Sequence, residues 1–195
     1  MEMGEKIGVS TMIKYENIFN IGLKTNIDLA GEARTASLVY TEDTMGESEL
    51  ATSSFGQGFN VTMIEMASAF SSIVNGGYYY EPHMVSKITN SSGDTIRNIE
   101  PRVLKQTISE TTSAQMRQYL YAAVAEGTGK SARPAGYAIG GKTGTAEKVP
   151  RDHKHYVVSF IGFAPADDPQ IVIYVVVDEP VSYTHLRAHE TTLHL

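Results

Sequence analysis

The spacing of apolar and polar positions predicts two helices in the middle of the chain. Thr62 and Glu65 form a capping box, and apolar residues then recur at helical spacing as far as Val74, where a pair of glycines follows. Ser109 is a suitable N-cap for the second helix, whose apolar stripe consists of Met116, Tyr119, Leu120, Ala123 and Val124. We therefore expect helices over residues 62–75 and 110–126.

Extended segments follow both helices. Residues 78–89 and 95–99 are separated by a turn at Ser91–Asp94, which predicts a surface hairpin. Three longer strands are predicted over 138–148, 156–163 and 171–177. The connection between the last two is too short for a crossover helix, so these strands are antiparallel neighbours. The fold class is therefore α+β, with an antiparallel sheet flanked by helices.

The last of these strands differs from the others in its pattern. The run Ile171–Val177 is continuously apolar and does not alternate. Such a run is typical of a strand covered on both faces, and we expect that here.

The remaining segments are less regular. Residues 1–20 carry apolar positions at helical spacing, and residues 21–58 are predicted to form an irregular segment at the surface that is either functional or packed. Residues 182–195 have neither periodicity nor caps, and we interpret them as a non-native tail. The predicted domain is thus 1–181.

Composition narrows the possible functions. The 195 residues carry a net charge of −6, which disfavours nucleic-acid binding. The sequence has no cysteine, so disulfides, thiol catalysis and cysteine-ligated zinc are excluded. His153 and His155 form an H-x-H pair without an evident third ligand, so no metal site is expected. No apolar run approaches the roughly 20 residues that a membrane-spanning helix needs.

The candidate chemistry lies in the stretch Gly140–Lys148, which combines glycines with Lys142, Thr143 and Thr145 and suits an anionic ligand. One hypothesis is a P-loop, because Gly136–Thr143 satisfies the G-x-x-x-x-G-K-[ST] pattern and Ile173–Glu179 is similar to a Walker B strand. However, no strand is predicted before Gly136, and Gly144 and Pro150 oppose a helix after Lys142. A P-loop nucleotide-binding protein therefore stays an alternative.

The tripeptide K-T-G is also one of three motifs of penicillin-binding proteins and β-lactamases. Further motifs stand around it in order, namely Ser54–Gly58 with Val61 and Thr62, Asn75–Gly77, Pro82, Glu126–Gly129, Gly141–Ala146 and Ser159–Pro165. On these residues the chain resembles the C-terminal half of the transpeptidase domain of class B penicillin-binding proteins of the septal or sporulation type. The resemblance implies part of a β-lactamase/transpeptidase-like fold, with an N-terminal part and a C-terminal helix outside this sequence.

In that family a serine attacks the D-Ala–D-Ala bond of a peptidoglycan stem peptide, and an amine of a second stem resolves the acyl-enzyme. β-Lactams acylate the same serine, and no cofactor takes part. The resemblance implies that Lys142 supplies positive charge and that the Thr143 and Thr145 hydroxyls, with Gly144 between them, bind the substrate carboxylate. The Thr145 N–H would be one donor of the oxyanion hole. Strand alternation places Thr143 and Thr145 on one face and Lys142 on the other or along the edge.

The sequence departs from the family in two motifs. It contains no S-x-x-K, for which Thr11–Lys14 is the nearest imitation, and no S-x-N. We therefore expect the chain alone neither to transpeptidate nor to be acylated by penicillin. The resemblance implies a parent protein anchored in the bacterial cytoplasmic membrane, with this domain on the outer side and cell-wall or divisome membrane proteins as partners. A non-catalytic, penicillin-recognising sensor of the same fold stays a second alternative.

Overall fold

The computed structural model describes residues 2–150 and 155–180 of the chain. Its helices are α1 (Glu2–Ile7), α2 (Val9–Ile18), α3 (Glu47–Ser53), α4 (Met63–Val74) and α5 (Glu110–Ala125), with short 3-10 turns η1 (Ala36–Leu38) and η2 (Lys130–Ala132). Its strands are β1 (Tyr78–Tyr80), β2 (Lys87–Thr89), β3 (Thr95–Asn98), β4 (Val103–Gln106), β5 (Gly140–Glu147), β6 (Tyr156–Ala164) and β7 (Ile171–Asp178). All strand pairs are antiparallel. The predicted α+β class is confirmed.

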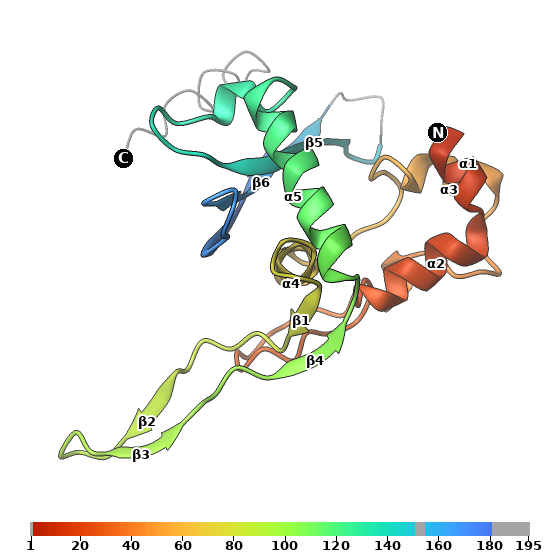
Figure 1. Ribbon diagram of the computed structural model, residues 1–195. Coiled ribbons are helices and arrows are strands. Elements are labelled where there is room, and N and C mark those ends of the chain that lie inside the picture. Colours follow the sequence, from red (N-terminus) through yellow and green to blue (C-terminus); the bar gives the residue numbers. More distant parts are fainter. Residues whose placement is uncertain (1, 151–154, 181–195) are drawn as a thin grey trace.

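The three long strands form one sheet in the order β5-β6-β7. Helix α5 runs across this sheet, and α4 lies beside α5 (Figure 1). The core between sheet and helices consists of Phe70, Val74, Leu120, Ile161 and Phe163. Because both helices pack on the same face of the sheet, they fix the position of β5 and its neighbours.

The two predicted helices form with the expected caps. The Thr62 hydroxyl accepts a hydrogen bond from the Glu65 N–H, and the Ser109 hydroxyl accepts one from the Thr112 N–H, each at 3.1 Å. The predicted apolar stripe of α5 is only partly correct. Leu120 and Val124 are buried, but Tyr119 is 67% exposed, because the buried face of α5 is narrower than the stripe.

The prediction that the last strand is covered on both faces is wrong for the described residues. Val172 and Tyr174 pack against the core, whereas Ile171, Ile173, Val175 and Val177 are between 38% and 55% exposed. The physical reason is that α4 and α5 cover one face of the sheet only. The continuous apolar run therefore marks a strand with one packed face and one apolar face that the described residues leave open.

The predicted hairpin is present as β2 and β3, which project far from the helices (Figure 1). The sequence did not predict β4, which pairs with β1 and forms the base of this arm. Nor did it predict α3, which lies within the segment expected to be irregular. Strand β4 has four residues and helix α3 has seven, too few for the spacing of apolar residues to show a strand or helix period.

Glu65 ties the irregular segment to α4. Its side chain is 1% exposed, and its carboxylate accepts hydrogen bonds from the Thr62 N–H and from the Thr35 hydroxyl. A buried carboxylate needs such partners, because leaving water costs several kcal/mol that only hydrogen bonds or counter-charges offset. One side chain therefore caps α4 and also fixes the loop that carries Thr35.

We expect Glu65→Ala to lower the free energy of unfolding by about 2–4 kcal/mol, because it leaves the Thr35 hydroxyl and the Thr62 N–H without their acceptor. Urea unfolding of the purified protein measures this. Glu49→Ala is the matched control, since Glu49 accepts from the Gly46 N–H in the same capping position of α3, but it is only half-buried and this hydrogen bond is exposed. We expect it to cost about 1 kcal/mol or less. Equal losses in the two variants would contradict the role given to Glu65.

Candidate functional site at the free edge of β5

One edge of β5 pairs with β6, and the other edge has no partner strand among the described residues. The Ala138 C=O accepts from the Ala166 N–H at 2.9 Å, and the Lys148 N–H donates to the His155 C=O at 2.8 Å. Ala138 and Lys148, the even-numbered residues that flank β5, thus direct their backbone groups toward the β6 side. Since backbone groups alternate along a strand, the N–H and C=O groups of Gly141, Thr143, Thr145 and Glu147 point to the free edge.

Two side chains contact carbonyl groups on this edge. The Lys142 Nζ donates to the Thr143 C=O at 2.8 Å, and the Gln57 Nε2 donates to the Thr145 C=O at 3.3 Å. The hydroxyls of Thr128 and Thr143 lie 3.4 Å apart. Segments that are far apart in sequence therefore meet at the four predicted site residues 142–145.

Gln57 and Thr128 were not predicted as site residues. A signal for both was present, because Gln57 lies in the Ser54–Gly58 motif and Thr128 in the Glu126–Gly129 motif that carried the family resemblance. What the sequence could not give was the three-dimensional contact of either loop with β5.

The side chains of the site lie on two faces of the sheet. Lys142 is opposite Ile161, whose side chain belongs to the core under the helices, whereas Thr143 is opposite Phe160 and Thr145 opposite Val158 on the other face. Strand alternation predicted this arrangement. Among the described residues the ammonium group of Lys142 bonds only to a neutral carbonyl, so its charge is not neutralised by a carboxylate.

The glycines of β5 permit close packing on β6 and α5. A β-carbon at Gly140 would lie 2.4 Å from the Phe163 Cζ, and one at Gly141 would lie 2.6 Å from the Ile161 carbonyl oxygen. At Gly144 a β-carbon would lie 2.6 Å from the Ser159 Oγ. The absence of a side chain at these glycines therefore allows β5 to pack closely on its neighbours.

A second lysine, just after β5, has the opposite environment. The Lys148 Nζ lies 2.7 Å from the Glu179 Oε1 and 3.0 Å from the Asp178 Oδ1, and the His155 Nδ1 lies 3.2 Å from the Glu179 Oε2. The hydrogen bonds from Lys148 and then from His155 lower the pKa of the Glu179 carboxyl. The hydrogen bond to Glu179, and after it the one to Asp178, raises the pKa of the Lys148 ammonium group. This cluster joins the end of β5 to the end of β7 across β6.

The P-loop hypothesis is wrong. Lys142 lies inside a strand, and no helix begins at it. Gly136 lies in the loop after η2 with φ of +82°, so no strand leads into it. The candidate Walker B strand, β7, is antiparallel to β6 and forms part of the same small sheet.

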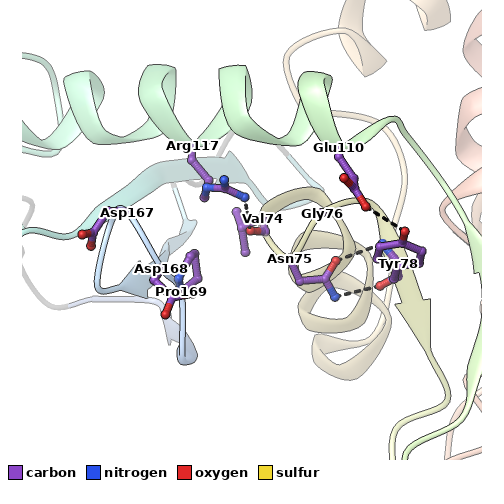
Figure 2. A pocket seen from close by; sticks show the side chains of 9 residues that line it. All are labelled: Val74, Asn75, Gly76, Tyr78, Glu110, Arg117, Asp167, Asp168 and Pro169. Atoms are coloured by element: carbon purple, nitrogen blue, oxygen red, sulfur yellow. Dashed lines mark hydrogen bonds between the residues drawn. The ribbon is translucent and has the colours of Figure 1, made fainter.

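A pocket of about 330 Å³ lies near the start of α5, at the junction with the end of α4 and the β6–β7 turn (Figure 2). Its charged side chains are Glu110, Arg117, Asp167 and Asp168, and none of residues 142–145 lines it. Arg117 donates to the Val74 C=O at 3.0 Å, and Glu110 accepts from the Tyr78 hydroxyl at 2.9 Å. These contacts connect α4, α5 and β1, so they serve the fold.

Residues 2–150 and 155–180 contain no group of three or more histidine, aspartate or glutamate side chains that could hold a metal ion. In the same residues, no helix has the length and apolar character needed to cross a membrane. The predicted tail 182–195 and His153 lie outside the described residues, so those two interpretations stay predictions.

Comparison with known proteins decides the family. The family model described as the penicillin binding protein transpeptidase domain matches residues 1–194. The chain belongs to this family. The predicted resemblance to class B penicillin-binding proteins is thereby confirmed.

Two curated relatives are similar to this chain over most of its length. It is 46% identical over 185 residues to stage V sporulation protein D of Bacillus subtilis, covering 92% of this chain and 28% of the relative. It is 29% identical over 188 residues to the probable peptidoglycan D,D-transpeptidase PenA of Neisseria gonorrhoeae, covering 93% and 30%. The chain thus spans less than a third of the length of these relatives.

Solved structures agree with the fold. Penicillin-binding protein 3 of Mycobacterium tuberculosis in its apo form superposes with a TM-score of 0.83 at 27% identity, covering 93% of this chain and 43% of that one. The transpeptidase domain of penicillin-binding protein 3 from Burkholderia pseudomallei gives a TM-score of 0.81 at 29% identity, covering 97% and 55%. The predicted partial transpeptidase fold is confirmed.

We expect Gly141→Ala to destabilise the protein by about 1–3 kcal/mol, because the new methyl group meets the backbone of β6, which cannot move without disturbing the sheet. Gly144→Ala is the matched control: its methyl group meets only the Ser159 hydroxyl, which can rotate away, so it should cost less. Thermal or urea unfolding compares the two. A larger loss for Gly144→Ala would contradict the packing described for β5.

The lowered pKa of Glu179 has a consequence for acid stability. A carboxyl group whose folded pKa is lowered stabilises the folded protein above its unfolded pKa, and this stabilisation is lost as the pH falls through the folded pKa. We expect Lys148→Met to weaken the dependence of Tm on pH between about pH 6 and pH 3. Lys87→Met, at an exposed lysine of the β2–β3 arm, is the control and should follow the parent curve. Parallel curves for Lys148→Met and the parent would contradict the ion-pair role.

Proposed function

We propose that this chain supplies the substrate-binding edge of a peptidoglycan D,D-transpeptidase, and that β-lactams bind at the same edge. The observation that carries the proposal is the free edge of β5, where the backbone groups of Thr143 and Thr145 stand beside the un-neutralised charge of Lys142. An extended peptide can accept hydrogen bonds from the outward N–H groups of Thr143 and Thr145, as peptides do in other strand-addition complexes, while Lys142 and Gln57 hold the two carbonyls.

Each residue has a role in the proposed chemistry. Lys142 and the hydroxyls of Thr143 and Thr145 bind the terminal carboxylate of the stem peptide, which needs a cation and hydrogen-bond donors. Gly144 lies between the two threonines and brings the backbone close to the ligand. The Thr145 N–H stabilises the oxyanion that develops when the peptide carbonyl is attacked, and losing such a donor costs about 3–4 kcal/mol of transition-state stabilisation.

The attacking serine is supplied by residues outside these 195, because the sequence contains neither S-x-x-K nor S-x-N. The share of the curated relatives that the chain covers, 28% to 30%, is in keeping with such a division. We propose that the whole protein carries both motifs, together with an anchor in the bacterial cytoplasmic membrane that holds this domain on the outer side. It would act there with cell-wall or divisome membrane proteins.

The β-lactam part of the proposal is supported by relatives. Structures of penicillin-binding protein 3 of Mycobacterium tuberculosis have been solved in complex with aztreonam and with ampicillin, and this chain is 27% and 26% identical to them. The curated relatives named peptidoglycan D,D-transpeptidases favour a synthase over a non-catalytic sensor of the same fold. Release of D-Ala from a stem-peptide substrate by the full-length protein separates the two, because a sensor is acylated without turning over.

We expect a fluorescent penicillin to label the full-length protein covalently and to leave the 195-residue chain unlabelled on a denaturing gel. The reason is that the carboxylate-binding edge is present in both but the nucleophile only in the former. Lys142→Ala in the full-length protein should reduce labelling by at least about a hundredfold, because it removes the cation beside the ligand carboxylate. Labelling of the 195-residue chain, or undiminished labelling of Lys142→Ala, would contradict the proposal.

A further inference from the structure

Gln57 lies in a loop whose backbone is fixed. The N–H groups of Phe55 and Gln57 both donate to the Thr52 C=O near the end of α3, at 3.3 and 3.1 Å. Gly56 and Gly58, on either side, have φ of +86° and +91°, values that favour glycine. A β-carbon at Gly58 would also come within 3.1 Å of the Tyr40 hydroxyl. These hydrogen bonds and glycines therefore fix the backbone conformation on both sides of Gln57.

That carboxamide reaches a backbone group 88 positions away in the sequence. The Gln57 Nε2 donates to the Thr145 C=O at 3.3 Å, on the edge of β5 that has no partner strand in the described part of the chain. In the described residues no other hydrogen bond holds this carbonyl. Gln57 therefore does for Thr145 what a neighbouring strand does for a paired residue.

The N–H and C=O groups of one residue in a strand point to the same edge. The Thr145 N–H, the proposed oxyanion donor, lies in the same peptide plane as the Gly144 C=O, which points toward β6, whereas the Thr145 C=O lies in the next peptide plane. Gln57 holds this second plane, so both peptide planes that meet at Thr145 are held. Electrostatic stabilisation of a transition state depends on donors that are already aimed before the charge develops. Holding this one residue of an edge strand thus bears on the rate of the chemical step.

We infer that Gln57 is a positioning residue for acylation, and that it acts by holding Thr145 in the orientation in which its N–H meets the developing oxyanion. This inference rests on the proposed function. The amide is suited to the task, because it donates to the carbonyl and adds no charge beside the ligand carboxylate. A glutamate of the same shape offers only oxygens at neutral pH, and these would repel both the carbonyl and the ligand.

The test uses the full-length protein and a penicillin, with the acylation rate constant and the dissociation constant of the non-covalent complex measured separately by stopped flow. Gln57→Ala should lower the acylation rate constant about tenfold and change the dissociation constant little, because the oxyanion forms only in the transition state. Gln57→Glu should lower the rate constant further. The melting temperature of both variants should remain near that of the parent, since one surface hydrogen bond is lost.

Gln170→Ala is the matched control. The Gln170 Nε2 also donates to a backbone carbonyl at 3.3 Å, that of Asp168, but in the β6–β7 turn away from the free edge. It should leave the acylation rate constant unchanged.

The experiment distinguishes a wrong role for Gln57 from a wrong proposed function. If the parent is acylated and Gln57→Ala and Gln57→Glu are acylated at the parent rate, the role of Gln57 is wrong and the proposed function stands. A fall in labelling that follows only a loss of folded protein, with an unchanged rate constant in the folded fraction, also overturns the role of Gln57. If the full-length parent is not acylated at all, the proposed function fails and the inference fails with it.

Discussion

Pairing between β5 and β6 consumes the backbone hydrogen bonds of the even-numbered residues of β5, and the site depends on the groups that this pairing leaves over. The register places Thr143 and Thr145 outward. A shift by one residue would turn their backbone groups inward and present Lys142 and Gly144 at the edge instead. Packing of Gly140 and Gly141 against Phe163 and the β6 backbone opposes such a shift, because larger residues would not fit there. The glycines thus specify the register, and the register specifies the site.

Two lysines near β5 show how local charge separates binding from structure. Lys148 lies among Asp178, Glu179 and His155, so its charge is satisfied within the fold. Lys142 bonds to a carbonyl oxygen, so its charge is left for an anion. Lys142 belongs to β5 and Lys148 follows it directly, and each adds one positive charge to the net charge of the chain. Only the positions of the carboxylates around them give one a structural role and the other a proposed binding role.

Local signals in the sequence predicted much of this fold. The capping box of Thr62 and Glu65 and the N-cap Ser109 located both central helices, because cap chemistry depends on neighbouring residues alone. The short elements α3 and β4 were missed, because so few residues establish no period. The exposed face of β7 was missed for a different reason. A continuous apolar run predicts that both faces of the strand are covered, but among the described residues only one face of β7 is packed against helices. Residues 142–145 could be proposed from a motif, but the contact of Gln57 with Thr145 depends on tertiary structure and had no sequence signal of its own.

The central claim is that the backbone groups of Thr143 and Thr145 form the ligand-binding edge of β5. Residue-resolved hydrogen exchange of the full-length protein, with and without covalently bound penicillin, tests it most directly. The N–H groups of Lys142 and Gly144 should already be protected without ligand, because they bond to β6, whereas the Thr145 N–H should exchange readily and become protected when penicillin is bound. Strong protection of Thr145 in the free protein, or no change at Thr145 on acylation, would contradict the account.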